Sequence, residues 1–223
     1  MREQVKASIA ESLRVLQTDV IDLLQLHHTP VEVVKRGRVL AAAREAQRSG
    51  AVRFIGASTY GEDAPLAVLE SGGYDTLQVA YNLADRTLEE TVLPLAQQQN
   101  VGIIVRSVLL RGVLTHRYKL IPPALDDLKA AIGKLDALAS AGGVGYNAEV
   151  GSLPEMAYRF VLANAAVSTA LVGTARMEEL EAALAFADKG RLPPALVSAI
   201  RAEGNVSDRS QLIPSNWPAD SGV

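Results

Sequence analysis

Cysteine is absent from the 223 residues of this sequence. Its absence excludes disulfide scaffolds, thiolate zinc sites, iron–sulfur clusters and cysteine nucleophiles. Basic residues are not in excess either, because 22 Lys and Arg face 25 Asp and Glu, and the net charge of −3 argues against nucleic-acid or anionic-membrane partners. No apolar run approaches the roughly 20 residues that span a bilayer, and the amphipathic start at Met1 does not resemble a signal peptide. A cytoplasmic enzyme or binding domain is therefore expected.

The motifs of several enzyme classes are also missing. No G-x-G-x-x-G follows a strand-like segment and no G-x-x-x-x-G-K-[ST] occurs, which weakens the case for a doubly wound nucleotide-binding sheet. A Ser–His–Asp triad has no support, because no G-x-S-x-G occurs. His27 and His28 are adjacent, and neighbouring side chains on a strand point apart, so we expect no metal site.

What the sequence contains is a regular alternation of two kinds of segment. Apolar residues make up 48% of the chain and charged residues 21%, as in an ordinary globular domain. Apolar residues at helical spacing predict helices over residues 5–16, 31–47, 64–71, 87–99, 125–139, 153–162, 177–186 and 196–201. Short apolar runs rich in branched residues predict strands over residues 20–27, 52–58, 76–81, 101–106 and 168–172.

This order predicts an α/β fold with five parallel strands alternating with helices. Such near-continuous apolar strands are expected to be buried on both faces. Either a (β/α)8 barrel or an open doubly wound sheet would fit the pattern. We expect residues 1–203 to form this body and residues 204–223 to form a polar surface tail, in which Trp217 docks on the body or covers a pocket.

Polar residues stand at the carboxyl end of each predicted strand. In parallel α/β proteins the loops at these ends carry the chemistry, and convergent polar groups on an apolar body form a ligand site. The candidate positions are His27, His28, Ser58, Thr59, Tyr60, Gln78, Tyr81, Asn82, Arg106, Ser107, Gly173, Thr174, Ala175 and Arg176.

Two of these positions have both a chemical and a purely structural interpretation. A histidine that closes an apolar strand, such as His27, can polarise a carbonyl or move a proton, or it can simply be hydrogen-bonded there. Gly173 and Thr174 precede a helix, where they can hold a phosphate or merely cap the helix. Their place after the last strand favours phosphate, because barrels often bind phosphate at that point.

Five segments, taken in order, resemble the aldo-keto reductases, which are NAD(P)H-dependent (β/α)8-barrel oxidoreductases. The resemblance is to the fourth strand with its preceding helix, the fifth and sixth strands, the seventh strand with its cofactor loop, and the seventh helix through the phosphate-binding loop. The matching segments are IAESLRVLQTDVIDLLQLHHTP, GAVRFIGAST, LQVAYNLADR, VGIIVRSVLLRGVLTH and LPEMAYRFVLANAAVSTALVGTARMEELEAALA.

The resemblance implies a role for each matched polar residue. His27 stands where the catalytic tetrad has its histidine. Ser58 and Gln78 stand where the family holds the nicotinamide carboxamide, with Thr59 in the place of the usual asparagine. The cofactor-binding residues implied in this way are Ser58, Thr59, Gln78, Arg106, Ser107, Gly173, Thr174 and Arg176.

The sequence departs from the family pattern beside the phosphate loop. The Glu-Asn pair that usually contacts the adenine is replaced by Ala182-Ala183. Glu179 stands in place of an arginine that often reaches the 2′-phosphate of NADP, and a carboxylate repels a phosphate. Arg176 lies about one helical turn earlier and can partly compensate. The candidate cofactors are therefore NADP, which the family implies, or NAD.

The resemblance also implies that the family's first three strands, with the tetrad aspartate, tyrosine and lysine, are absent. No tyrosine of the chain matches the tetrad motif. A barrel that begins at its fourth strand is an open sheet with free edges at 20–27 and 168–172, which invite pairing with a second copy or a complementing chain.

Three functions follow as hypotheses. The first is reduction of a small-molecule carbonyl, or oxidation of an alcohol, with NADP or NAD, by a chain that is incomplete on its own. The second is a non-catalytic remnant of the family that serves as a subunit or cofactor-binding module, which the alanine pair and Glu179 favour. The third is an unrelated barrel enzyme that takes a phosphate-bearing substrate at the last loop.

Overall fold

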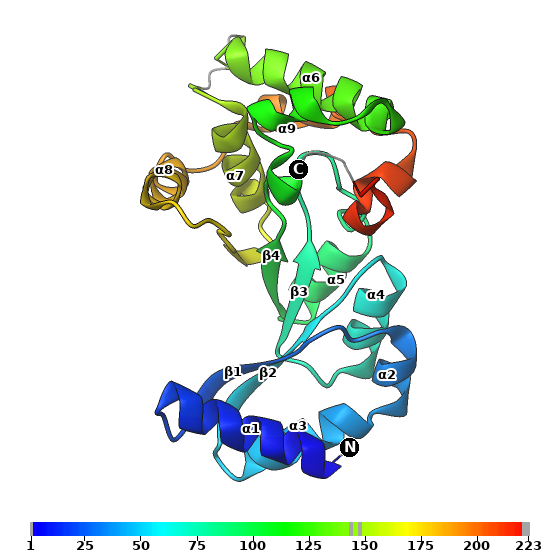
Figure 1. The fold of residues 1–223 in the computed structure, drawn as a ribbon, viewed down its shortest axis with the longest axis vertical. Coiled ribbons are helices and arrows are strands. Elements are labelled where there is room, and N and C mark those ends of the chain that lie inside the picture. The colour runs from blue at the N-terminus through cyan, green and yellow to red at the C-terminus, as the bar shows by residue number, and fades with distance from the viewer. Residues whose placement is uncertain (1, 143–144, 147–148, 220–223) are drawn as a thin grey trace. The chain divides into compact units, whose positions relative to one another are not determined.

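The computed structural model describes residues 2–142, 145–146 and 149–219, and it shows the predicted α/β fold. Five strands form one sheet in the order β1-β2-β3-β4-β5, so that β1 and β5 lie at its edges (Figure 1). The strands are β1 Ile21–Leu26, β2 Val52–Ser58, β3 Thr76–Ala80, β4 Gly102–Arg106 and β5 Val167–Ala170. The prediction of five parallel strands alternating with helices is confirmed.

Helices precede, separate and follow the strands. The α-helices are α1 Arg2–Leu16, α2 Val31–Arg36, α3 Arg38–Arg48, α4 Asp63–Ser71, α5 Val92–Gln98, α6 Asp126–Ser140, α7 Leu153–Ala163, α8 Met177–Asp188 and α9 Pro194–Glu203. Short 3-10 helices occupy Leu110–Gly112, His116–Leu120, Pro123–Leu125, Arg209–Leu212 and Pro214–Asn216. None of the helices in the described ranges is long and apolar enough to cross a membrane.

Two predicted helices have different limits in the structure. The helix predicted over 31–47 is two helices, because Gly37 adopts a left-handed φ of 63° and its N–H closes α2 on the carbonyls of Val33 and Val34. The helix predicted over 87–99 begins only at Val92. Pro94 therefore lies in its first turn, where its missing N–H breaks no bond.

The chain divides into two compact units. The first comprises the described residues up to Val79 together with Thr87–Ile104. Its core is formed by β2, β3 and the helices that pack on them, with Ile55, Val68 and Leu77 almost fully buried. In the sheet, β1 pairs with β2 from Ile21↔Val52 to Leu26↔Ala57.

Burial of the edge strands is weaker than the sequence predicted. In β1 only Ile21 is buried, and in β5 no residue is buried. Each edge strand has one neighbour in the sheet instead of two, which leaves part of its surface uncovered. Phe54 of β2, beside β1, is also exposed. The expectation of strands buried on both faces therefore holds for the interior strand β4, but is wrong for β1 and β5.

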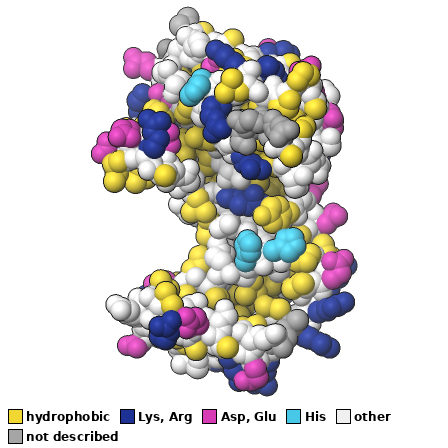
Figure 2. All heavy atoms as spheres, viewed as in Figure 1, with side chains coloured by type: hydrophobic (Ala, Val, Ile, Leu, Met, Phe, Trp, Pro, Cys, Tyr) yellow, Lys and Arg dark blue, Asp and Glu magenta, His cyan; other side chains and the backbone are white. Residues whose placement is uncertain are grey.

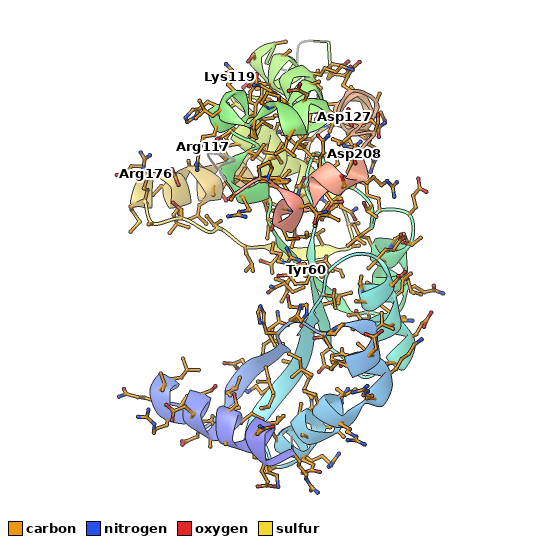
Figure 3. All side chains as sticks on the ribbon, turned by 45° about the vertical axis from the view of Figure 1, so that its right-hand side comes forward. Tyr60, Arg117, Lys119, Asp127, Arg176 and Asp208 are labelled. Carbon is orange, nitrogen blue, oxygen red and sulfur yellow. The ribbon has the colours of Figure 1, made fainter. Side chains whose placement is uncertain are left out.

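The second unit comprises Ala80–Arg86 and the described residues from Val105 onward. In it, α6 packs against α7 and α9. The polar tail is hydrogen-bonded to α6. The backbone N–H of Leu128 donates to the side chain of Gln211 at 3.0 Å, and Asp127 accepts from the N–H of Asp208 at 2.7 Å (Figure 3). Trp217 is buried and its indole N–H donates to the carbonyl of Gln211 at 2.8 Å.

A buried ion network ties one corner of the second unit together. Glu155 accepts from Arg159 at 2.8 Å and from Lys189 at 2.9 Å, and also from the backbone N–H of Gly151 at 3.0 Å. Arg159 in turn donates to the carbonyls of Glu149 and Gly190. Burial acts to raise the pKa of Glu155, but these donors outweigh it and hold the pKa below its ordinary value.

Candidate functional site

In the first unit, the loop that follows β1 is fixed to the end of β2. The N–H of Thr29 donates to the carbonyl of Ser58 at 3.0 Å, and the buried Thr29 hydroxyl donates to the carbonyl of Leu26 at 2.8 Å. His27 and His28 lie between these anchors and are exposed. His28 adopts a left-handed φ of 53° and its ring lies 5.7 Å from that of Tyr60. The tight turn thus presents His27 to solvent at the carboxyl end of β1.

Three residues predicted to bind the cofactor come together beside it. Ser58 and Gln78 are paired in register on β2 and β3, and Nε2 of Gln78 donates to Oγ of Ser58 at 3.3 Å. The N–H of Thr59 donates to the carbonyl of Gln78 at 3.1 Å. Ser58 and Thr59 are buried, while Gln78 is half-buried and is the most accessible of the three.

Gln25 belongs to the same group, although sequence reasoning missed it. Its Nε2 donates to Oε1 of Gln78 at 3.1 Å. We call Gln25, Ser58 and Gln78 the amide cluster. The signal for Gln25 was available, because it lies two residues before His27 and side chains two apart on a strand share a face. An amide and a hydroxyl present donors and acceptors without charge, which suits a neutral carboxamide.

The remaining predicted residues lie in the second unit, where a cavity of about 880 Å³ opens between the loop after β4 and the start of α8. Ser107, Gly173, Thr174 and Arg176 line it. Arg106 does not line it, and donates to Oγ of Ser107 at 3.3 Å. Glu179 and Ala182, which replace polar contacts of the family pattern, also line the cavity. The other lining residues, which the sequence did not single out as cofactor contacts, include Arg111, Thr115, His116, Arg117, Tyr158, Glu178 and Phe186.

The loop after β4 turns tightly along this cavity. Ser107, Leu110 and Arg111 all have left-handed φ values, of 59°, 44° and 55°. Non-glycine residues rarely adopt this conformation, and it concentrates at functional loops. The carbonyl of Ser107 is held by the side-chain amide of Asn82 at 3.2 Å. The loop brings Arg111 to the cavity wall.

Charges of both signs surround the second-unit cavity. Figure 2 shows Lys and Arg side chains at several separate places on the face that it draws, and Figure 3 labels Arg117 and Arg176, two of the cavity's cations. Arg176 is exposed and lies 3.5 Å from Glu179 and 3.9 Å from Glu178. Thr174 donates its hydroxyl to Glu179 and accepts the N–H of Arg176 at 3.0 Å. Thr174 thus closes a turn before α8 and lines the cavity, whereas the N-cap position of α8 is Arg176, which makes no side-chain cap hydrogen bond.

Two aromatic side chains complete the cavity wall. The rings of Tyr158 and Phe186 lie 6.4 Å apart. Burial raises the pKa of Tyr158, and the negative charge of Glu179 adds to the effect, so its hydroxyl stays protonated at neutral pH. The cations and hydroxyl groups can donate hydrogen bonds to a phosphate, and the aromatic rings can pack against an attached base. The lining therefore fits an organic phosphate that carries a base.

The first unit also contains a smaller cavity. A cavity of about 270 Å³ in the first unit lies beside His28, Tyr60 and the acidic residues Glu32, Glu62 and Asp63. Within residues 2–142, 145–146 and 149–219, no three His, Asp or Glu side chains converge as metal ligands would.

The sequence model of the aldo/keto reductase family matches residues 1–203. The chain belongs to the aldo/keto reductase family. Among its relatives is Aldo-keto reductase YhdN of Bacillus subtilis, 28% identical over 197 residues that cover 81% of this chain and 57% of YhdN. L-galactose dehydrogenase of Arabidopsis thaliana is 30% identical over 190 residues, covering 80% of this chain and 56% of that protein. The chain therefore spans somewhat more than half the length of these relatives.

Solved structures of aldo-keto reductases have the same fold. The holo form of aldo-keto reductase AKR11C1 from Bacillus halodurans superposes with a TM-score of 0.75 at 24% identity, covering 94% of this chain and 70% of that chain. A glycerol dehydrogenase from Gluconobacter oxydans gives a TM-score of 0.71 at 22% identity, covering 98% of this chain and 67% of that one. The predicted family and its barrel-type α/β fold are thus confirmed, whereas the roles of the individual residues stay predictions.

Proposed function

We propose that this aldo-keto reductase binds a nicotinamide cofactor and interconverts a carbonyl and an alcohol on a small molecule by hydride transfer. The observation that carries the proposal is the convergence of Ser58, Thr59 and Gln78 beside the exposed His27 at the strand ends of the first unit. The names of two relatives, NADH-specific methylglyoxal reductase of Escherichia coli and L-galactose dehydrogenase, support a small carbonyl or alcohol as the substrate class.

The residues divide the work by their chemistry. When bound, a reduced nicotinamide supplies the hydride that a carbonyl carbon accepts. Ser58 and Gln78 would hold its carboxamide through neutral hydrogen bonds. His27 would donate a hydrogen bond to the carbonyl oxygen and so orient the substrate. In the second unit, Arg176 and Thr174 would hold phosphate oxygens, with charge assistance from the guanidinium.

Glu179 bears on the choice between NADP and NAD. Its carboxylate accepts from Thr174 and faces Arg176, so the cation at this cavity wall is already partly neutralised. A carboxylate accepts hydrogen bonds from a free ribose diol but repels a 2′-phosphate. We propose that the chain binds both cofactors and favours NADH over NADPH, against the family-based expectation of NADP.

The proposed reaction also needs a proton donor. The family's tyrosine, lysine and aspartate would come from the first three strands of the barrel, and removing a general acid typically costs about 10² to 10⁴ in rate. We propose that the chain corresponds to the later five strands, and that a second copy or a complementing segment supplies the rest along the edges β1 and β5. The expectation of a cytoplasmic location, drawn from the sequence, stays part of this proposal.

A non-catalytic cofactor-binding member of the family is the second candidate. It is favoured by Ala182 at the wall of the second-unit cavity, where the family pattern has a polar contact, and by Glu179. In that case the chain binds the cofactor but turns over no carbonyl.

One set of measurements separates these candidates. NADH and NADPH are titrated into the full chain, and binding is followed by cofactor fluorescence and by thermal shift. Turnover is then assayed with methylglyoxal, comparing the chain with His27→Asn and with the neighbouring control His28→Asn. Binding with turnover that falls in His27→Asn alone supports the enzyme, and binding without turnover supports the second candidate. Absence of binding at millimolar cofactor contradicts both.

A further inference from the structure

Three strands of the first unit carry polar side chains in two rows on one face. The register pairs Gln25 of β1 with Gly56 of β2, and Gly56 with Thr76 of β3. Two residues further along, it pairs Ser58 with Gln78. Because side chains two apart on a strand share a face, both rows lie on the same face of the sheet. The amide cluster therefore runs diagonally from the first row to the second.

The contact between Gln25 and Gln78 crosses the whole width of β2. Neighbouring strands lie about 4.8 Å apart, so β1 and β3 are separated by two such spacings. A Cβ atom on Gly56 would stand 2.1 Å from Oε1 of Gln25 and 2.3 Å from Oγ1 of Thr76, which leaves no room for a side chain. Gly56 is thus the gap through which the Gln25 side chain passes.

This contact selects one of two orientations for the Gln78 amide. In the structure Oε1 of Gln78 accepts from Gln25, and its Nε2 donates to Ser58. Turning the amide by 180° would set two NH₂ groups against each other at Gln25. Ser58 cannot make the selection, because a hydroxyl donates and accepts equally well. The group that decides the orientation of Gln78 is therefore Gln25.

Gln25 is itself held in one orientation. Its Oε1 is buried beside Gly56 and has no hydrogen-bond partner among the residues that the structure describes. If the Gln25 amide turned on its own, its oxygen would face Oε1 of Gln78, and two acceptors would meet where a donor now meets an acceptor. The hydrogen bond to Gln78 would be lost, so the observed orientation is favoured.

We propose that Gln25 is a positioning residue for cofactor recognition: by its hydrogen bond across Gly56 it fixes the Gln78 amide so that a defined donor and acceptor meet the nicotinamide carboxamide. Gln78 is half-buried and retains one N–H and one lone pair beyond those that Ser58 and Gln25 use. An amide held at both ends recognises another amide in one orientation only. The inference rests on the proposed function, which assigns the carboxamide to this cluster.

Gln25→Glu provides the test, because the two side chains have the same shape and differ only in hydrogen bonding and in the charge of the ionised carboxyl group. A carboxylate only accepts, so Gln78 must turn to donate to it. We expect the affinity for NAD⁺ to fall on the order of tenfold at neutral pH. As the pH falls through the pKa of the new carboxyl group, its protonated form donates again and the affinity should recover. Calorimetric titration of the full chain measures both.

Adenosine diphosphate ribose, which lacks the nicotinamide, is the matched ligand. Its affinity should not change in Gln25→Glu. Thr76→Val is the matched variant, because it alters the same face of the sheet without touching a hydrogen bond of the amide cluster, and should bind both ligands as the unaltered chain does. An equal loss of both ligands in Gln25→Glu, or no loss of NAD⁺, overturns the inference.

A second readout needs no cofactor. The side-chain amide resonance of Gln78, identified by its disappearance in Gln78→Glu, should move in Gln25→Glu and stay in place in Thr76→Val. An unmoved resonance in Gln25→Glu overturns the inference even if cofactor binding changes. A chain that binds neither NAD⁺ nor adenosine diphosphate ribose overturns the proposed function, and this inference with it.

Discussion

The two units of the chain hold their candidate functional residues in opposite ways. In the first unit, neutral groups such as Ser58 and Gln78 lie on paired strands and bond to one another. In the second unit, charged groups such as Arg176 and Glu179 lie on exposed loop and helix ends around a cavity. Strand pairing fixes direction, whereas exposed charges attract over a longer range but select orientation poorly. Under the proposed function, the first unit orients the ligand and the second attracts it.

The largest effect on the free energy of unfolding is expected at Glu155, because its charge is buried inside the second unit and not exposed on its surface. The Glu155→Gln change removes the charge that faces Arg159, whose side chain is 7% exposed. A buried charge left without its partner typically costs about 3–5 kcal/mol. We expect a loss of this size in the free energy of unfolding, measured by urea denaturation.

The pH dependence of stability gives the control for this prediction. The pKa of folded Glu155 lies below its ordinary value of 4.5, so the ion network contributes fully above that value. Its contribution is lost as the pH falls through the folded pKa. The unaltered chain should therefore lose stability more steeply in acid than Glu155→Gln does, and parallel curves would contradict the assignment.

One glycine in each unit lies among the candidate functional residues, and replacing each with alanine tests how tightly the two places are packed. In Gly56→Ala the new methyl group meets Gln25 and the stiff, branched Thr76. Overpacking of this kind typically costs about 1–3 kcal/mol. In Gly173→Ala nothing lies within 4 Å of the added atom, so we expect no loss of stability. Urea denaturation of the two variants measures the difference, and equal losses would remove the contrast between the units.

Two threonines, one in each unit, allow the same comparison for the loss of one hydroxyl group. Thr29 is buried and donates to Leu26 at 2.8 Å, whereas Thr174 is exposed beside Glu179. Thr29→Val should cost about 1 kcal/mol, the usual net value of one hydrogen bond. Thr174→Val should cost nothing measurable, because exposed polar contacts exchange with water. Thermal unfolding of both variants provides the measurement, and a larger loss in Thr174→Val would reverse the argument.

The sequence predicted the strands and the strand-end positions because both depend on local pattern. Runs such as Ile103–Val105 are apolar whichever way they face, and the polar residue that follows marks the end of the strand. It could not predict the contact of Gln25 with Gln78, which depends on the register of three strands and on the gap at Gly56. It also missed the break at Gly37, since glycine within a helical pattern often causes none.

For the second unit, the sequence identified Thr174 and Arg176 but not the surroundings that define the cavity. Tyr158 and Phe186 lie on two different helices, and only their packing brings the rings within 6.4 Å. The opposing charges of Arg176 and Glu179 could be predicted, because three residues make about one helical turn. The docking of Gln211 on α6 could not, because no periodicity links residues that distant.

Glu179 gives the smallest effect and the most direct test of the second unit's electrostatic role. Its carboxylate is exposed, pairs with Arg176 at 3.5 Å and accepts from Thr174. In Glu179→Gln the guanidinium is released and the repulsion of a 2′-phosphate disappears, so NADPH should gain affinity over NADH by about two- to fivefold, the range of an exposed ion pair.

Because salt screens exposed charges, the gain should shrink when ionic strength is raised from about 0.05 to 0.5 M. The free energy of unfolding should not change in Glu179→Gln. The loss of NAD⁺ affinity caused by Gln25→Glu should also be the same with and without Glu179→Gln, because Gln25 and its partners lie in the first unit. Paired titrations with both cofactors at each ionic strength measure the ratio. A gain that persists in high salt would mean that Glu179 acts through a directional hydrogen bond instead of its charge, and that the second unit also orients its ligand.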